Sequence, residues 1–223
     1  VHDKLQWIFQ VMFCNIHNLV IVSYNESFKL PHFDYHTSLL SMLKHLDFDY
    51  NTLPKSLHID SLIQNTVTQN AISKKRYIIN WCGNPQNPHE KHNRGMSLVN
   101  VLPLFKLENI HWIVISKNLS QQDKDLLLRV GVEFLGDDVD NGENAFEDSI
   151  QIIRNVDGVV STDTSLVHLA PMLRVKTFVL LTTGSEWRWT RNEHTNWYPE
   201  SVLIRQDTHG DWKSVIHKLI PLL

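Results

Sequence analysis

The sequence predicts an α/β fold, a doubly wound, Rossmann-like parallel sheet with helices on both faces, together with a remnant of a second domain. Two observations lead to this prediction. From about residue 75, short apolar runs alternate with segments whose apolar residues repeat at helical spacing, and the connections are short. The apolar runs are continuous rather than alternating, which is typical of strands covered by helices on both faces. Such repetition implies parallel strands joined by right-handed crossovers.

The expected elements follow from these runs. Six strands are expected, at 77–79, 112–115, 132–135, 158–160, 177–181 and 202–204. Helices are expected at 97–105, 120–130, 145–155, 165–173 and 211–219. In a sheet of this type, ligands bind beyond the carboxyl ends of the strands, so the functional residues should follow the strands.

The first 70 residues lack this rhythm. A short apolar run at 19–22 precedes a loop, and the leucines of segment 38–46 fall on one face of an expected helix. We therefore divide the chain into residues 1–70 and a Rossmann-like domain of residues 71–223.

Composition excludes several classes of protein. Of the 223 residues, 42% are hydrophobic and 20% charged, as in an ordinary globular protein, and the net charge of −3 gives no reason to expect nucleic acid as a partner. The two cysteines, Cys14 and Cys82, fit two free thiols in a reducing cytoplasm. The most apolar early stretch, 7–24, is interrupted by polar residues, so no transmembrane segment is expected.

The stretch from Val159 to Ala170 carries the strongest functional signal. A buried strand is followed by Thr162-Asp163-Thr164-Ser165, and a helix with His168 in its first turns comes next. Backbone N–H groups at such a helix start suit a diphosphate. The same polar residues are also plausible helix caps, and His168 is equally plausible as a packed side chain.

A second loop follows the first strand of the domain. Gly83 would let the backbone approach a ligand, Asn84 lies beside it, and Lys91 and Arg94 add positive charge before the next helix. The alternative is a solvated loop. The spacing in His89-Glu90-Lys91-His92 differs from that of zinc-protease helices, and we expect no metal there.

A third loop, 183–199, is rich in aromatic residues. Trp187 and the other aromatic residues of this loop suit a sugar ring or a base, and Arg188 suits a phosphate. The alternative is that these aromatic side chains fold the loop onto the body of the domain.

Two weaker candidates complete the set. Asp34 and His36 have side chains suited to acid–base catalysis, although a structural role is also open. The acidic turn 137–142 has the wrong ligand register for a calcium loop, and we interpret it as a solvated turn.

Taken in order, these stretches resemble a known family. The segment "DTSLVHLA" (163–170) resembles the corresponding segment of heptosyltransferase-like glycosyltransferases. The segments "FDYHTSLLS", "WCGNPQNPHEKHNRG" and "EWRWTRNEHTNWYPESVLIRQDTHGDW" resemble, in order and spacing, a bacterial branch in which this domain follows tetratricopeptide repeats.

The resemblance implies a GT-B architecture, in which two Rossmann-like domains face a cleft and the C-terminal one binds a nucleotide diphosphate sugar. Residues 71–223 would be that donor domain, and residues 1–70 a remnant of the acceptor-side domain and linker. The resemblance implies no cofactor, because the nucleotide diphosphate sugar is a substrate. It implies no metal either, because helix N-termini and basic side chains can stabilise the departing diphosphate. The donor-binding residues implied by the match are Gly83, Asn84, Lys91, Arg94, Asp163, Thr164, Ser165, His168, Trp187 and Arg188.

The chain departs from the family pattern in several places. No glycine-rich first strand and turn, near which the family's catalytic base lies, occurs in residues 1–70, so we expect the N-terminal part of the acceptor domain to be missing. Gly95 stands where the family has serine, and Pro171 where it has a small residue. The first departure bears on catalysis and the others on donor affinity.

Two functions remain open at this point. The first is an inverting glycosyltransferase that transfers a sugar to an acceptor hydroxyl on a glycan or protein. The alternative is a degenerate, non-catalytic module that binds a nucleotide or a protein. A generic nucleotide-binding Rossmann enzyme fits less well, because the chain has neither G-x-G-x-x-G nor a Walker A motif.

Overall fold

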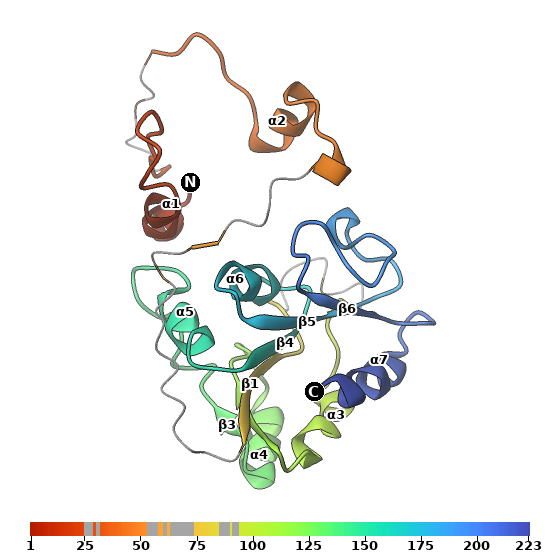
Figure 1. Ribbon diagram of the computed structural model, residues 1–223. Coiled ribbons are helices and arrows are strands. Elements are labelled where there is room, and N and C mark those ends of the chain that lie inside the picture. Colours follow the sequence, from red (N-terminus) through yellow and green to blue (C-terminus); the bar gives the residue numbers. More distant parts are fainter. Residues whose placement is uncertain are drawn as a thin grey trace.

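The structure is a computed structural model that describes residues 1–24, 29, 32–52, 58–59, 62, 74–84, 90 and 94–223. Lys91, one of the residues implied as donor-binding, lies outside the described residues. Figure 1 shows a layered α/β body, with the N-terminal segment lying over one side of it.

Six parallel strands form one sheet in the order β3-β2-β1-β4-β5-β6. The strands are β1 (Lys75–Asn80), β2 (Ile110–Val114), β3 (Glu133–Phe134), β4 (Gly158–Thr162), β5 (Lys176–Leu181) and β6 (Val202–Arg205). This is the order of a dinucleotide-binding Rossmann sheet. The prediction of a doubly wound parallel sheet is confirmed, and each expected strand is present.

Helices lie between the strands as expected. They are α3 (Leu98–Val101), α4 (Gln121–Val130), α5 (Glu147–Ile153), α6 (Leu166–Met172) and α7 (Trp212–Leu219). The single helix expected at 97–105 is wrong in one respect: α3 ends at Val101 and the 3₁₀ helix η5 (Leu104–Lys106) follows. Pro103 lacks the N–H that would continue the helical hydrogen bonds, so the chain tightens there. A last 3₁₀ turn, η7, spans Ile220–Leu222.

Alternate residues of each strand face opposite layers of the core. Tyr77 and Ile79 of β1 pack with buried residues of α3, α4 and α7, whereas Ile78 packs with buried residues of α5 and α6. This alternation follows from the pleat of a strand. It explains why the apolar runs are continuous, and Figure 1 shows the helices on both faces.

The N-terminal segment contains η1 (Asp3–Leu5), α1 (Gln6–Met12), α2 (Leu39–His45) and η2 (Tyr50–Thr52). Its described residues contact the body at α1, at residues 48–50 and at Ile59, which is buried and donates its N–H to the carbonyl of Met172 over 3.0 Å. On α1, Ile8 is buried in the layer of α5 and α6, and the indole nitrogen of Trp7 donates to the carbonyl of Ala145 over 3.0 Å. The second contact, made by residues 48–50, bears on the site and is described below.

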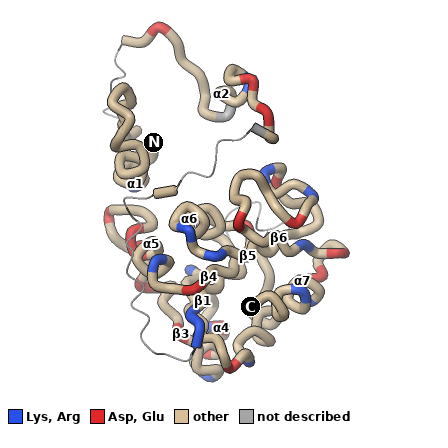
Figure 2. The backbone as a smooth tube through the Cα atoms, viewed as in Figure 1, with Lys and Arg blue, Asp and Glu red and all other residues tan. Residues whose placement is uncertain are grey.

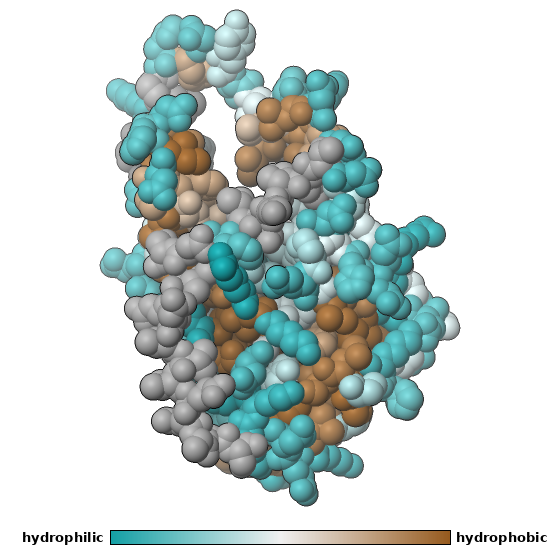
Figure 3. Space-filling model, viewed as in Figure 1, coloured by the Kyte–Doolittle hydropathy of each residue, from teal (hydrophilic) through white to brown (hydrophobic). Residues whose placement is uncertain are grey.

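The helix expected at 38–46 is present as α2, with the Ser38 hydroxyl accepting from the N–H of Ser41. Its apolar side chains are largely exposed: Leu39 is 79% accessible and Leu46 67%. Figure 3 shows this apolar surface on α2. Figure 2 shows basic and acidic residues interspersed over the body, in keeping with the small net charge. No helix within the described residues is long and apolar enough to cross a membrane.

Gly158 tests how tightly β1 and β4 pack. A Cβ at this position would lie 2.9 Å from Cδ1 of the buried Tyr77 and closer still to Cε1. We expect Gly158→Ala to lower the free energy of unfolding by about 1–3 kcal/mol, the usual cost of overpacking a core. Urea denaturation would measure this. Gly142→Ala is the matched control, because nothing lies within 4 Å of its Cβ. An equal, small effect of both substitutions would contradict the packing described here.

Candidate functional site

The strand order places a crevice at the carboxyl ends of β1 and β4. The chain leaves β1 towards β2 and leaves β4 towards β5, so the connections diverge at this point of the sheet. Ligands of doubly wound sheets bind at such a switch point.

A buried polar network joins three strand ends in this crevice. The Asn80 amide nitrogen donates to the Thr164 hydroxyl over 3.2 Å, and its amide oxygen accepts from the Ser116 hydroxyl over 2.5 Å. The Thr164 hydroxyl also lies 2.9 Å from that of Ser161, which donates to the carbonyl of Thr162 over 2.8 Å. Since Ser161 uses its proton there, Thr164 must donate to Ser161. The Thr164 hydroxyl therefore uses its proton and accepts a hydrogen bond within the protein.

Ser165 is placed differently. It is exposed, precedes α6, and no side chain caps that helix. Ser165 is the N-cap residue of α6, but the alternative in which one of the polar side chains of residues 162–165 caps the helix by a hydrogen bond is not realised, and the Thr164 hydroxyl is directed to the strand ends. Ser165 is thus the hydroxyl of this stretch that is accessible to a ligand.

Two cavities meet at Thr164 and Ser165. The larger has a volume of about 520 Å³ and the smaller about 370 Å³. The larger is lined by Arg94, Asp163, Thr164, Ser165, His168, Leu180, Leu181, Thr182, Gly184, Ser185, Glu186 and Arg188. The smaller is lined by Lys4, Asn80, Cys82, Gly83, Asn84, Ile115, Lys117, Asn118, Val139, Asp140, Ala145, Phe146, Ser149, Thr164, Ser165 and Leu166.

Arg94 enters the larger cavity as one half of an ion pair with Glu90. The guanidinium nitrogens lie 2.7 and 2.8 Å from one carboxylate oxygen of Glu90, which is largely buried. A Cβ at Gly83 would lie 2.5 Å from that oxygen, and one at Gly95 would lie 2.7 Å from the other. Both glycines thus leave room for a carboxylate that the sequence reasoning had not included in the site. Burial, together with the nearby negative charge of Glu90, raises the pKa of the Cys82 thiol to about 11.

The loop after β5 brings Arg188 and Glu186 to the same cavity. The Arg188 Nε lies 3.1 Å from the Glu186 carboxylate, and the guanidinium lies 5.6 Å from the ring centre of Trp187. Arg205 of β6 is hydrogen-bonded to this loop. Its guanidinium donates to the carbonyls of Thr182, Trp189 and Thr190, and to the hydroxyl of Ser185. Arg205 therefore fastens the first half of the loop, residues 182–190, to the sheet.

His168 is held by two aromatic side chains of that loop. Its ring stacks on the buried Trp189 at 5.3 Å between ring centres, and its Nδ1 lies 3.0 Å from the hydroxyl of Tyr198. Burial lowers the pKa of His168, and Arg188 lowers it further against the opposing effect of Asp163. His168 thus faces the cavity as a neutral imidazole near neutral pH.

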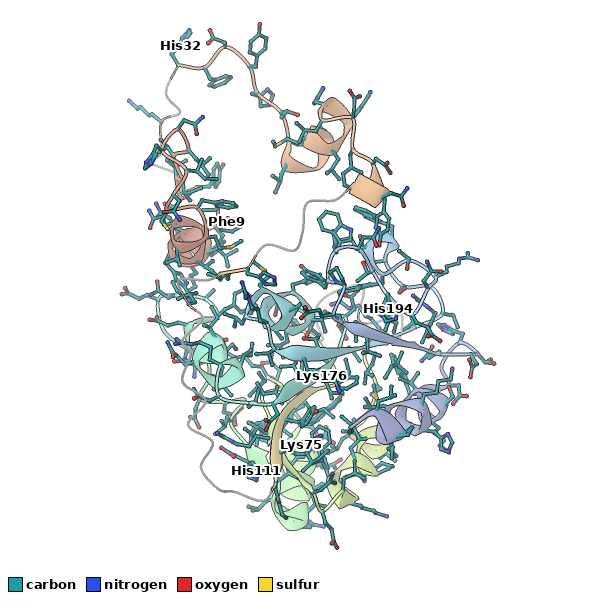
Figure 4. All side chains as sticks on the ribbon, in the orientation of Figure 1. Phe9, His32, Lys75, His111, Lys176 and His194 are labelled. Atoms are coloured by element: carbon teal, nitrogen blue, oxygen red, sulfur yellow. The ribbon has the colours of Figure 1, made fainter. Side chains whose placement is uncertain are left out.

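The residues expected at the site fall into four groups. Arg94, Asp163, Thr164, Ser165, His168 and Arg188 line the larger cavity, and Gly83 and Asn84 line the smaller. Trp187 is half-exposed and packs edge-on against Trp197 beside the cavity. Asp34 and His36 line neither cavity: they lie on an exposed loop with His32, which Figure 4 labels at the far end of the N-terminal segment.

Two kinds of site feature were missed from the sequence. Ser116 bonds to Asn80, which lies 36 residues earlier at the end of β1, and Glu90 pairs with Arg94 of its own loop, four residues later. The pairing of His168 with Tyr198 joins residues 30 apart. No group of three or more His, Cys, Asp or Glu side chains suited to a metal occurs in the part of the chain that the structure describes.

Comparison with known proteins gives a likeness of fold. No protein-family model matches the chain, and no curated protein matches it. Two solved structures of E. coli heptosyltransferase WaaC are similar at 14% identity, one with ADP-2-deoxy-2-fluoro heptose (TM-score 0.46) and one with ADP (TM-score 0.47). The similarity covers 81% of this chain and 53% and 54% of those chains, so this chain spans about half their length.

The lowered pKa of His168 makes a testable contribution to stability. The unfolded chain binds a proton near the ordinary pKa of 6.5, whereas folded His168 resists protonation, so its contribution is lost as the pH falls below that value. We expect urea denaturation to show a smaller loss of stability between about pH 7.5 and about pH 5.5 in His168→Gln than in the wild type. The exposed His17→Gln is the control and should follow the wild type. Equal losses in all three proteins would contradict the assignment.

Proposed function

We propose that this chain binds a nucleotide diphosphate sugar and serves as the donor-binding part of a GT-B glycosyltransferase. The observation that carries the proposal is the pair of cavities, of about 520 and 370 Å³, which meet at the accessible Ser165. A nucleotide diphosphate sugar has two bulky ends joined by a diphosphate, and this shape fits two cavities with a polar junction.

The diphosphate would lie at the junction, with positive charge supplied by the larger cavity. Arg94 and Arg188 both line that cavity, and guanidinium groups bind phosphate oxygens in paired hydrogen bonds. Each guanidinium is already oriented by a glutamate, Glu90 or Glu186, which fixes its position before a ligand arrives. The Ser165 hydroxyl would add a neutral donor.

The two ends of the ligand are distinguished by the cavity walls. Ile115, Val139 and Phe146 give the smaller cavity apolar surface of the kind that packs against a base. The larger cavity has the carboxylates of Asp163 and Glu186, which accept hydrogen bonds from sugar hydroxyls. We therefore assign the nucleoside to the smaller cavity and the sugar to the larger.

The reaction proposed is an inverting, metal-independent transfer. An acceptor hydroxyl on a glycan or protein attacks the anomeric carbon from the face opposite the diphosphate, the bond from that carbon to the diphosphate oxygen breaks, and a base takes the hydroxyl proton. Arg94 and Arg188 would stabilise the negative charge that develops on the departing diphosphate. In this proposal residues 71–223 are the donor domain, residues 1–70 belong to the acceptor side, and the protein acts in the cytoplasm.

A binding module without turnover is the second candidate. It is favoured by the position of Asp34 and His36, the two side chains considered as bases, which line neither cavity. Such a module would hold the nucleotide sugar without releasing the nucleotide.

Isothermal titration with a panel of nucleotide diphosphate sugars tests the binding. We expect Arg188→Gln and Arg94→Lys each to weaken binding about 10- to 100-fold, the effect of losing charge-assisted hydrogen bonds. Arg94→Lys keeps a positive charge beside Glu90, so the fold is retained. The exposed Arg129→Gln on α4 is the control and should bind like the wild type.

Release of nucleoside diphosphate in the presence of acceptor mixtures separates the two candidates. Release that depends on an acceptor supports transfer, whereas tight binding without release supports the module. Failure of every nucleotide sugar to bind would refute both.

A further inference from the structure

Residues 48–50, far from the loop after β5 in sequence, lie directly on it. The ring of Phe48 stacks on Trp197 at 6.1 Å between centres and meets Trp187 edge-on at 6.4 Å. Trp187 and Trp197 contact each other edge-on at 5.8 Å. Phe48 thus completes an aromatic cluster on the loop that carries Arg188, beside the larger cavity.

Tyr50 adds hydrogen bonds whose direction can be worked out. The Thr195 hydroxyl donates its proton to the carbonyl of Arg188 over 2.6 Å, because a carbonyl oxygen only accepts. The Tyr50 hydroxyl, 3.0 Å from that of Thr195, must therefore be the donor in this contact. It accepts in turn from the N–H of Asn196 over 2.9 Å, and the Asn196 amide nitrogen donates to the carbonyl of Tyr50 over 3.2 Å.

These hydrogen bonds connect the N-terminal segment to the backbone of Arg188. The middle member, Thr195, is 2% exposed, and its hydroxyl also accepts from the N–H of Trp197 over 3.2 Å. One buried hydroxyl therefore links Tyr50, the backbone of Arg188 and the turn at Trp197. A shift of Tyr50 would leave this buried hydroxyl with one hydrogen bond fewer.

Within this part of the N-terminal segment, the contact with the loop after β5 is confined to residues 48–50, which argues against simple core packing. Leu39 and Leu46, just before it in the same segment, are largely exposed. Phe48 and Tyr50 line neither of the two cavities. The ring contacts of Phe48 and the hydroxyl hydrogen bonds of Tyr50 are made to the loop that presents Arg188 and Glu186.

We propose that Tyr50 is a positioning residue for Arg188, and that residues 48–50 act as a clasp that holds the loop after β5 in the conformation competent to bind an anionic ligand. This inference rests on the proposed function for its ligand, a diphosphate. Tyr50 touches no ligand; it acts through Thr195 and the backbone of Arg188. Donor affinity would then depend on whether residues 48–50 are in contact with the loop after β5.

The test is Tyr50→Phe, which removes the hydroxyl and keeps the ring. Inorganic pyrophosphate and the tightest-binding nucleotide sugar serve as probes in titrations. We expect Tyr50→Phe to weaken binding of both by about three- to tenfold, since net hydrogen bonds are lost and the loop is less ordered. Tyr24→Phe is the control: Tyr24 is 81% exposed and should bind like the wild type.

A double-mutant cycle distinguishes positioning from a general loss of stability. If Tyr50 acts through Arg188, Tyr50→Phe should weaken binding little or not at all when Arg188→Gln is already present. Additive losses, or unchanged binding in Tyr50→Phe when Arg188→Gln weakens it, would overturn the inference.

Amide hydrogen exchange provides a readout that needs no ligand. We expect faster exchange at Thr190, Asn196 and Trp197 in Tyr50→Phe and unchanged exchange in the strands. Unchanged exchange in the loop would overturn the clasp. If the loop loosens but neither probe binds the wild type, the proposed function fails while the clasp itself stands, so the two failures are distinguishable.

Discussion

The side-chain amide of Asn80 joins three strand ends at the edge where both cavities open. It is buried, and it accepts from Ser116 after β2 while donating to Thr164 beyond β4. A buried amide of this kind stabilises a structure only when both of its ends are satisfied, because an unmatched donor or acceptor costs about 1–3 kcal/mol. The register of β1 against β4, and the position of the turn that leads to α6, therefore depend on this residue. Ser165 and Asp163 are presented to the larger cavity because Thr164 between them is held in place.

This network changes the meaning of the polar run 162–165. From the sequence, its hydroxyl groups could serve as helix caps or as phosphate ligands, since both uses favour the same residue types after a strand. In the structure the Thr164 hydroxyl is used by Asn80 and Ser161, and Thr162 is fully buried. The accessible groups are those of Ser165 and, beside it, the two guanidiniums of Arg94 and Arg188. Anion recognition at this edge would thus rest on arginine side chains from two separate loops more than on the hydroxyl run itself.

The difference between what could and could not be predicted has a physical basis. The strands and most helices are encoded by local periodicity, so runs such as 158–160 and 177–181 were sufficient to predict β4 and β5 and the edge of the sheet at which the two cavities lie. The contacts that build the site join residues distant in sequence: Asn80 with Thr164, His168 with Tyr198, and Tyr50 with Thr195. No spacing rule marks such pairs, because each depends on the geometry of the folded sheet. Gly83 shows the consequence, since its small size was attributed to an approaching ligand but accommodates the carboxylate of Glu90.

The loop after β5 is held from two sides, and this bears on how an aromatic loop outside the sheet could contribute to binding. Arg205 fastens residues 182–190 of the loop to β6 through hydrogen bonds to its carbonyls, and burial lowers the pKa of this guanidinium. Phe48 and Tyr50 hold the loop from the N-terminal segment. A guanidinium that is already ordered loses less side-chain entropy on meeting a phosphate, a difference of about 0.5–1.5 kcal/mol per side chain. Arg205 constrains residues 182–190 of the loop but not the turn at 195–197. Residues 48–50 constrain that turn from a part of the chain outside the sheet.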